Sequence, residues 1–393
     1  MKNEGKHLKT MYYQKNKQYT THTNTTFTRT PADSILIVVV VFIVVFGLMA
    51  VFSASAPKAI GYGDNPFSFT LKQLMWLIGG VAGAWFFSTF FDYRRLRPFA
   101  GVLTLIVLVA LLLVQFTPLG VTVNEAKRWL VIGPLQFQPS EMAKPALVLY
   151  FATLFSKNCM IVDSNKYPFY IMFAMMLLLI YKQPNLSMII LLIVTALAMY
   201  YVAGGSTKVI TSGIVGGILV VATTIRDYQL QRIKVWWNPF MDALGAGYNI
   251  IQSMVAFSSG GFFGVGFGNS KQKLSWLPEG HTDFIFAVIG EEFGFLGCFF
   301  LVCLFGVFLH RGFIIAKKCP DMYGKLLAVG ITFSICFQAF TNMSVASSFV
   351  PATGIPLPFI SYGGSSLFVS LCMIGVLINI SKTRVQRIVH YVQ

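Results

Sequence analysis

Few ionisable residues occur within the apolar segments of this 393-residue chain, and two short stretches hold the most informative ones. The first stretch contains Glu141 and Lys144, whose i,i+3 spacing places them on one helix face, where they can form an ion pair or line a polar cavity. The second runs from Asp283 to Glu291 and Glu292, about 12 Å further along a helix. Because charged groups are costly in hydrocarbon, each is a candidate functional residue.

Asp283 is the main candidate for acid–base chemistry. The cations expected on the same side lie in two loops: Arg232, Lys271 and Lys273, and Lys127 and Arg128. A carboxylate among cations suits a general base beside a phosphate-containing substrate, because Arg and Lys form charge-assisted hydrogen bonds with phosphates. Two plainer interpretations stay open: Thr282 and Asp283 can cap a helix N-terminus, and the basic residues can be solvated loop charges.

A helix that begins at Asp283 would place only one of the following glutamates near it. At about 100° per residue, Glu291 lies about 80° around the axis from Asp283, whereas Glu292 lies on the opposite face. Glu291 is therefore counted with Glu141, Lys144 and the loop cations among the candidate substrate-binding residues.

Several other signals do not predict a site. The glycine run at 264–268 follows no strand of a βαβ unit and lacks the Gly-Lys-Ser/Thr of a phosphate-binding loop. The five histidines are scattered, with only His281 near Asp283, and the six cysteines lack metal-ligand spacing. We therefore expect no protein-built metal centre and no cofactor, although a divalent cation bound to a substrate pyrophosphate is compatible with the sequence.

The composition predicts an all-α polytopic membrane protein. The chain is 55% hydrophobic and 11% charged, with a mean hydropathy of +0.68, which is far from the values of a water-soluble domain. Ten segments are apolar and long enough to span a bilayer. They are residues 34–53, 71–91, 98–115, 140–156, 167–182, 186–203, 208–225, 284–309, 324–348 and 363–381.

The distribution of positive charge predicts the orientation of these spans. Nineteen Lys and Arg residues fall on the side that carries both termini and ten on the other, so both termini are expected in the cytoplasm. The net charge of +16 thus reflects topology rather than nucleic-acid binding. We divide the chain into a basic cytoplasmic tail, residues 1–33, and a membrane domain, residues 34–393, whose large outer loop, residues 226–283, carries aromatic anchors typical of interfacial or re-entrant helices.

Two long motifs resemble one family. The stretch GNSKQKLSWLPEGHTDFIFAVIGEEFGFLG at 268–297 is similar to the outer loop and following helix of the FtsW/RodA/SpoVE (SEDS) family, and PATGIPLPFISYGGSS at 351–366 is similar to its C-terminal signature. Supporting matches occur at 52–56, 124–141 and 232–253, so the resemblance covers the chain from about residue 34 to the end.

The resemblance implies a ten-span fold and a glycosyltransferase that polymerises lipid II into β-1,4 glycan strands at the outer face of the cytoplasmic membrane. It implies that Asp283 is the catalytic residue, a general base on the acceptor hydroxyl. The motifs look most like the cell-division type, which implies septal cell-wall synthesis with a class B penicillin-binding protein as transpeptidase partner, and with other division proteins. Two alternatives stay open: a lipid II flippase, whose charges should line a path across the bilayer, and a non-catalytic scaffold.

Two positions depart from the family pattern. Asn185 replaces an aspartate that family members usually carry, so a second outer carboxylate is not expected here. The sequence Asn124-Glu125-Ala126-Lys127-Arg128-Trp129 is also altered but keeps its two cations, and phosphate binding at Lys127 and Arg128 is still expected.

Overall fold

The computed structural model describes residues 22–123, 126–132, 135–156, 167–224, 227–274 and 276–390. Residues 1–21 of the predicted tail, together with Asn124 and Glu125 of the altered motif, lie outside the described residues. The elements are β1 (His22–Arg29), α2 (Ser34–Gly61), α3 (Ser68–Thr89), η1 (Tyr93–Phe99), α4 (Ala100–Phe116), β2 (Gly120–Val123), β3 (Ala126–Ile132), β4 (Leu135–Phe137), α5 (Pro139–Phe155), α6 (Tyr167–Lys182), α7 (Leu186–Val202), α8 (Thr207–Thr224), α9 (Asp227–Trp237), η3 (Pro239–Asp242), α10 (Tyr248–Gly260), α11 (Ile285–Lys318), α12 (Met322–Ala346), α13 (Gly364–Ser381) and β5 (Thr383–His390).

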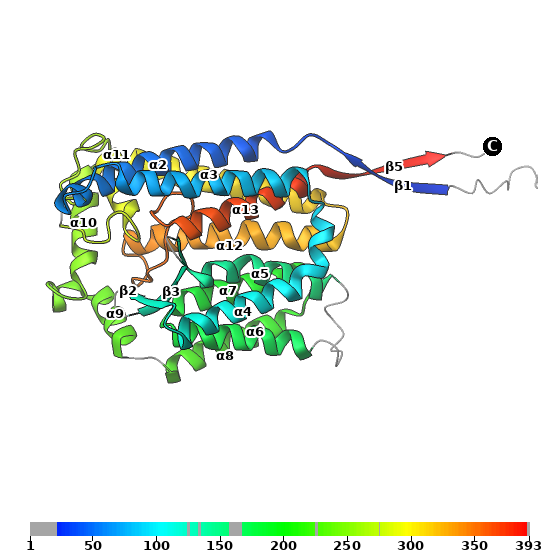
Figure 1. Cartoon of the computed structure of the whole chain (residues 1–393), viewed down its shortest axis with the longest axis horizontal. Coiled ribbons are helices and arrows are strands. Elements are labelled where there is room, and N and C mark those ends of the chain that lie inside the picture. The colour runs from blue at the N-terminus through cyan, green and yellow to red at the C-terminus, as the bar shows by residue number, and fades with distance from the viewer. Residues whose placement is uncertain are drawn as a thin grey trace, which may run out of the picture.

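Each of the ten predicted spans forms a helix, and these helices run side by side along one direction (Figure 1). Among the described residues, five helical stretches are individually long and apolar enough to cross a membrane, and two shorter apolar helices accompany them. Apolar side chains cover the outside of the bundle; Ile35, Val38 and Phe42 of α2 are all about half exposed or more. Because such a surface is stable only against lipid, the chain is a multi-pass membrane protein, as the hydropathy predicts.

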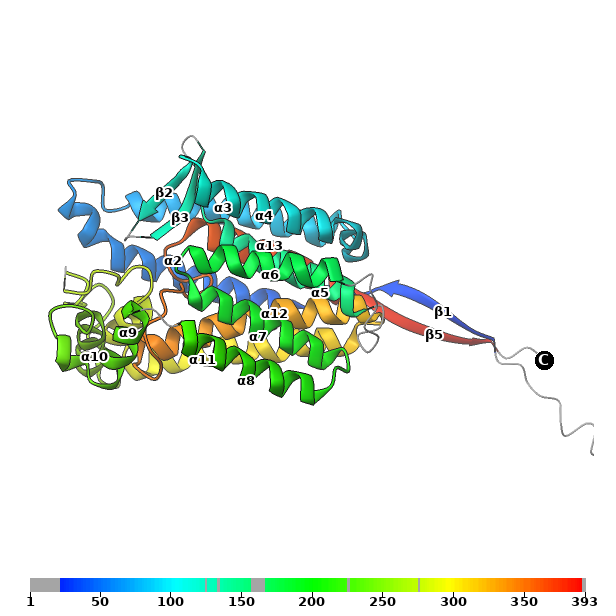
Figure 2. The same cartoon turned by 90° about the horizontal axis from the view of Figure 1, so that it is seen from below.

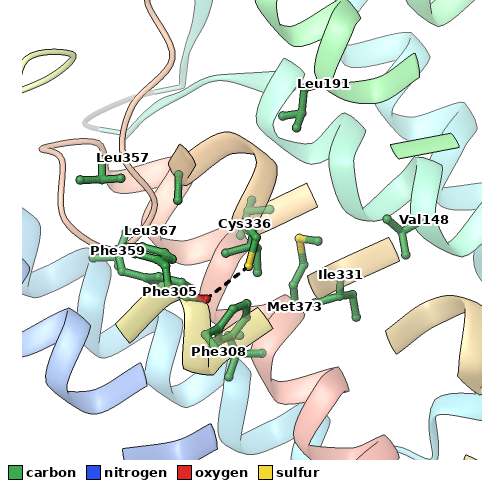
Figure 3. Close-up of a cluster of buried hydrophobic side chains, with 14 of the residues drawn as sticks. Val148, Leu191, Phe305, Phe308, Ile331, Cys336, Leu357, Phe359, Leu367 and Met373 are labelled. Carbon is green, nitrogen blue, oxygen red and sulfur yellow. Dashed lines mark hydrogen bonds between the residues drawn. The ribbon is translucent and has the colours of Figure 1, made fainter. Parts of the chain in front are cut away.

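Helix α12 is the centre of the bundle. It packs against α5, α7, α11 and α13, and 78% of its span is buried, compared with 22% for α11. Helices α3 and α13 form another closely packed pair, with α2 between α3 and α11. The segment that precedes α13 also enters this core: its Leu357 and Phe359 belong to the same buried cluster as Phe305 of α11 (Figure 3). The Phe305 carbonyl lies 3.9 Å from the Cys336 sulfur of α12.

The two ends of the bundle differ. Helices α9 and α10 and the β2-β3-β4 sheet lie at one end, here named the loop end, and the antiparallel β1-β5 ribbon projects from the opposite end, the ribbon end (Figures 1 and 2). Helices α9 and α10 agree with the helices expected in the long outer loop. The strands were not predicted, and β1 joins part of the expected free tail to the last strand of the chain, from the pair His22–His390 to Arg29–Thr383.

The glycine run at 264–268 has a structural role that its sequence alone does not indicate. Helix α11 breaks at Gly294, which has a φ of 64°, and the segment after α10 fills the break. The amides of Val265 and Gly266 donate to the carbonyls of Glu291 and Glu292 at 3.0 Å each. A Cβ at Gly264 would lie 2.2 Å from the Glu292 carbonyl oxygen, so only glycine allows this approach.

Candidate active site

Asp283 lies in a short loop immediately before α11, rather than inside the helix. Helix α11 begins at Ile285 with Phe284 as its N-cap, and no side chain caps it. The interpretation of Thr282 and Asp283 as a helix cap is therefore wrong. The loop is instead held by hydrogen bonds from the segment before α13: the Tyr362 amide donates to the His281 carbonyl at 2.9 Å, and the Ser361 hydroxyl donates to the Thr282 carbonyl at 2.6 Å.

Two buried amide side chains of α12 form hydrogen bonds with the backbone of this loop and of the segment before α13. Asn342 donates to the carbonyls of Asp283 and Ile355, both at 2.8 Å, and Gln338 donates to the carbonyl of Pro356 at 2.8 Å. Gln338 in turn accepts a 2.8 Å hydrogen bond from the Lys144 ammonium. These i,i+4 amides fix the Asp283 backbone relative to the 351–363 segment. Gln338 and Asn342 were not predicted as site residues, although polar amides in an apolar span are a signal that could have identified them.

The carboxylate of Asp283 has an environment that favours its protonated form. Burial, followed by the nearby Glu279 carboxylate, raises the pKa of Asp283 from 3.8 to about 6, against the opposing effects of Arg232 and Arg128. The side chain keeps partial exposure. Gly354 borders it, because a Cβ added there would lie 3.5 Å from Asp283 Oδ2. A reachable carboxylate with a pKa just below neutral pH has the properties of a general base.

Two of the predicted cations, Arg128 of β3 and Arg232 of α9, are electrostatic neighbours of Asp283. Arg128 donates to the carbonyls of Gln183 and Pro184 at 2.9 and 2.6 Å, which holds it beside the α6–α7 turn. Arg232 is exposed and donates to the Ala352 carbonyl at 3.1 Å. Burial and Arg232 lower the pKa of Arg128, so the two arginines repel each other. An anion placed between them would relieve this repulsion.

The site contains a second carboxylate that the sequence analysis did not identify. Glu279 lies one turn before Asp283, and its carboxylate accepts a 2.6 Å hydrogen bond from the Thr282 hydroxyl. The expectation that the site has one outer acid, based on Asn185, is thus wrong, because the second acid comes from another position. Asn185 itself caps α7, with its side-chain oxygen accepting from the Met188 amide at 3.3 Å.

His281 is close to this acid pair but is sequestered. Its ring packs against Phe69 and Tyr362, and its Nε2 lies 3.4 Å from the Lys58 ammonium. Burial, and then the positive charge of Lys58, lower the pKa of His281 to about 4, so the ring is neutral near pH 7.

The remaining predicted cations do not gather at Asp283. Lys127 donates to the Thr117 carbonyl at 2.8 Å and thereby satisfies the C-terminal end of α4. Lys273 is buried and forms a 2.7 Å ion pair with Glu292, supported by a 2.8 Å hydrogen bond to Ser53 of α2. Lys271 has an exposed side chain, and its backbone amide donates to Glu291. These positions favour structural roles over contact with a ligand of Asp283.

Glu291 also lies apart from Asp283. Its carboxylate accepts hydrogen bonds from the Ser270 hydroxyl at 2.5 Å and from the amides of Lys271 and Gln272 at 3.0 and 3.2 Å. Glu291, one of the candidate substrate-binding residues, is therefore not brought to Asp283, because α11 begins after Asp283 and the 270–272 segment covers Glu291.

Glu141 and Lys144 form the ion pair expected from their spacing, at 2.7 Å, and both are almost fully buried. Their link to Asp283 is indirect and runs through Gln338 and the 351–363 segment. Across the part of the chain that the structure describes, no group of three or more His, Cys, Asp or Glu side chains is placed to hold a metal ion.

The chain is similar to proteins of one family over most of its length. The model of the FtsW/RodA/SpoVE family, described as cell cycle protein, matches residues 33–386. A probable peptidoglycan glycosyltransferase FtsW of Trichlorobacter lovleyi is 37% identical over 354 residues, which cover 89% of this chain and 93% of that protein. Stage V sporulation protein E of Bacillus subtilis is 37% identical over 364 residues, covering 90% and 98%.

Solved structures agree with this similarity. A chain from a peptidoglycan synthase complex that coordinates polymerisation and crosslinking superposes with a TM-score of 0.73 and 29% identity, covering 89% of this chain and 97% of that one. The rod shape determining protein RodA of Thermus thermophilus superposes with a TM-score of 0.67 and 28% identity, covering 89% and 96%. The chain belongs to the FtsW/RodA/SpoVE family of multi-pass membrane proteins.

Proposed function

We propose that this protein is a peptidoglycan glycosyltransferase that polymerises lipid II into β-1,4 glycan strands, with Asp283 as the general base. The observation that carries the proposal is the position of this carboxylate: it is reachable, has a pKa raised to about 6, and is in the electrostatic field of two arginines. At neutral pH the Asp283 carboxylate is mainly ionised and can accept a proton. Because burial and Glu279 raise its pKa, it binds that proton more tightly than an ordinary aspartate does.

The reaction balances with these groups. Asp283 accepts the proton of the 4-hydroxyl group on the acceptor sugar while the oxygen of that hydroxyl group forms a bond to the anomeric carbon of the donor sugar. The bond from that carbon to the pyrophosphate breaks on the opposite face, so one displacement converts an α-linked donor into a β-linked product. Arg128 and Arg232 stabilise the negative charge that grows on the departing polyprenyl pyrophosphate. A divalent cation carried by that pyrophosphate would add to the same stabilisation, with Asp283 and Glu279 as the nearby carboxylates.

Two further elements belong to the proposal. The loop end faces the outside of the cytoplasmic membrane, and both termini lie in the cytoplasm, in agreement with the positive charges at the ribbon end. The protein works with a class B penicillin-binding protein and other division proteins at the septum; the similarity to a chain of a peptidoglycan synthase complex supports such a pairing.

The flippase alternative receives less support from the buried charges. A path for a charged headgroup needs ionisable groups that are available along the bilayer. Among the described residues, the buried carboxylates and lysines already have partners: Glu141 pairs with Lys144, Glu292 pairs with Lys273, and Glu291 accepts from the Ser270 hydroxyl and two backbone amides.

The test is polymerisation of lipid II by the purified chain with its transpeptidase, with and without divalent cations. Asp283→Asn should abolish glycan formation, whereas Asp64→Asn, an exposed loop-end residue, should leave it unchanged. Because the folded-state pKa of Asp283 is raised above 3.8, its ionised form disfavours folding above about pH 6, so the neutral variant should melt no lower than the wild type at pH 7. Full polymerisation by Asp283→Asn would contradict the proposal.

A further inference from the structure

A small cavity lies at the ribbon end, where the chain enters and leaves the bundle. Its volume is about 240 Å³, and its walls come from residues within 31–35 at the start of α2, 311–318 at the end of α11 and 380–383 at the end of α13. The connections from β1 to α2 and from α13 to β5 meet at this point (Figure 1). Because α11 runs from Asp283 to this cavity, the cavity is separate from the candidate active site.

Hydrogen bonds between the three walls hold the cavity in shape. Arg311 forms a side-on ion pair with Asp33, in which Nε donates to Oδ1 at 3.2 Å and Nη2 donates to Oδ2 at 2.5 Å. The Asp33 amide donates to the Ser381 hydroxyl at 3.1 Å, and this hydroxyl donates to the Ile378 carbonyl at 2.7 Å. The ion pair does not use Arg311 Nη1, which has no hydrogen-bond partner among the described residues and can donate to an anion.

The charges that line the cavity do not cancel. Asp33 pairs with Arg311, whereas Lys318 is exposed and, across the described part of the chain, forms no ion pair. Lys318 is nevertheless close to the pair: burial raises the pKa of Asp33, but the hydrogen bonds of its carboxylate and the positive charges of Arg311 and Lys318 outweigh burial and lower it. The cavity therefore offers a lysine and the free nitrogen of an arginine to an anionic ligand.

The cavity lies at the boundary between lipid-facing and polar surface. On α2, the exposed apolar surface begins at Ile35, which lines the cavity and is 47% exposed. On α11, the last exposed large apolar side chain is Phe313, and the exposed Lys317 and Lys318 follow it. A change from apolar to basic side chains marks the level of the phospholipid headgroups. The cavity is thus at headgroup depth, with Ile35 on the side of the hydrocarbon.

The size and charge of the cavity decide the class of ligand. A volume of about 240 Å³ is below the roughly 300–1,000 Å³ of pockets that enclose drug-sized ligands, so the cavity holds a compact polar group rather than a whole lipid. A phosphodiester is compact and negatively charged, and it accepts hydrogen bonds from both Arg and Lys. A zwitterionic headgroup would bring a further positive charge next to Lys318, whereas the headgroup of an anionic lipid would not.

We infer that this cavity binds the phosphate group of an anionic membrane lipid in the leaflet at the ribbon end. The phosphate accepts from Arg311 and pairs with Lys318, while the acyl chains leave the cavity past Ile35. A bound lipid adds contacts between the ends of α2, α11 and α13, and it therefore stabilises the folded chain. The inference does not depend on the proposed function, because it uses only the membrane-spanning fold.

The test uses the purified full-length protein in detergent with short-chain phosphatidylglycerol, kept below the concentration at which it forms micelles. Short-chain phosphatidylcholine and inorganic phosphate are the comparison ligands. The rise of Tm with ligand concentration gives an apparent Kd for each. Lys318→Gln removes the lysine that lines the cavity. Lys317→Gln, which removes the same charge from the adjacent exposed position outside the cavity, is the matched control.

We expect phosphatidylglycerol to raise the Tm of the wild-type protein more than either comparison ligand does. Lys318→Gln should weaken the binding of phosphatidylglycerol about fivefold, the contribution of one lysine to an anionic lipid, and Lys317→Gln should weaken it less than about twofold. Without ligand, both variants should melt as the wild type does, because both side chains are exposed. No stabilisation by phosphatidylglycerol, equal stabilisation by phosphatidylcholine or inorganic phosphate, or equal losses in the two variants would overturn the inference.

A second measurement locates the lipid. A photoreactive phosphatidylglycerol in vesicles should crosslink to peptides from the start of α2 or the end of α11, and Lys318→Glu, which reverses the charge, should weaken this binding about 25-fold. Lys317→Glu should retain most of the crosslink. Crosslinks spread evenly over the basic residues of the ribbon end would show adsorption without a site and contradict the inference. Because neither measurement uses glycan formation, failure of the proposed function would leave both results unaffected.

Discussion

Replacement of Glu279 by glutamine should move the acidic limb of the polymerisation pH profile to lower pH. The pKa of Asp283 is raised from 3.8 to about 6, first by burial and then by the negative charge of Glu279. Glutamine keeps the size of Glu279 and can still accept a hydrogen bond from Thr282, which now reaches the carboxylate at 2.6 Å. The substitution thus removes the charge and retains the local structure, so the pKa of Asp283 should fall.

The expected effect is large in the wild-type protein. If polymerisation requires ionised Asp283, a pKa of about 6 leaves about 90% of the enzyme active at pH 7 and about 10% at pH 5. With the ordinary value of 3.8, more than about 90% would stay active at pH 5. Because burial is the larger cause, Glu279→Gln should give a profile between these limits, with a higher ratio of activity at pH 5 to activity at pH 7.

The assay is kcat/KM for glycan formation between pH 4.5 and 8.5, since this parameter reports the free enzyme's ionisation. Arg232→Gln should shift the profile in the opposite direction. Because Arg232 lowers the pKa of Asp283, its loss should move the acidic limb of the pH profile to higher pH. Arg128 and the neutral His281 are unchanged in both proteins. An acidic limb that stays in place in both variants, or that moves upward in Glu279→Gln, would refute the assignment of this ionisation to Asp283.

Two further predictions concern the buried pair and the orientation of the chain. Lys144→Met should lower the free energy of unfolding by about 3–5 kcal/mol, because it leaves the buried Glu141 carboxylate without its partner. The double variant Lys144→Met/Glu141→Gln should recover much of this loss. A double-mutant cycle of thermal melts checks the prediction, and additive effects of the two substitutions would contradict it. The orientation can be tested by labelling single cysteines in a protein whose six native cysteines are replaced. Leu244→Cys, at a loop-end position that is 93% exposed, should react with an impermeant maleimide in intact cells, whereas Lys317→Cys, at the ribbon end, should react only after lysis. The reverse pattern would invert the proposed topology.

Hydropathy was sufficient to predict the ten spans, because the requirement for apolar helices in lipid acts on each segment separately. It could not predict the β1-β5 ribbon, whose pairing joins residues more than 350 positions apart, as in Arg29 and Thr383. For the same reason it could not distinguish Lys273 from a solvated loop lysine. The burial of this lysine depends on Ser53, 220 residues earlier, and on Glu292, which becomes accessible to it only through the fold of the loop.

The site was predicted in part, and its errors have one physical source. Arg128 and Arg232 were placed correctly near Asp283 because the positive-inside pattern assigns their loops to one side of the membrane. The angular argument for Glu291 failed because it assumed a continuous helix from Asp283, whereas α11 begins two residues later. Glu279 was overlooked because a carboxylate in a polar loop has no distinctive spacing, and its effect on Asp283 arises from the compact turn between them.

Helix α12 contacts both the Asp283 loop and an apolar groove of about 690 Å³ that it lines together with α7 and α9, which explains why a central span carries so many unlike side chains. One face presents Gln338 and Asn342, which hold the 355–356 backbone and the carbonyl of Asp283. A separate face, about 140° around the axis at 100° per residue, forms a wall of this groove. A shift of α12 would move both the Asp283 loop and the groove wall. The position of the proposed base therefore depends on one central helix, through the hydrogen bonds of Gln338 and Asn342, rather than on separate loops.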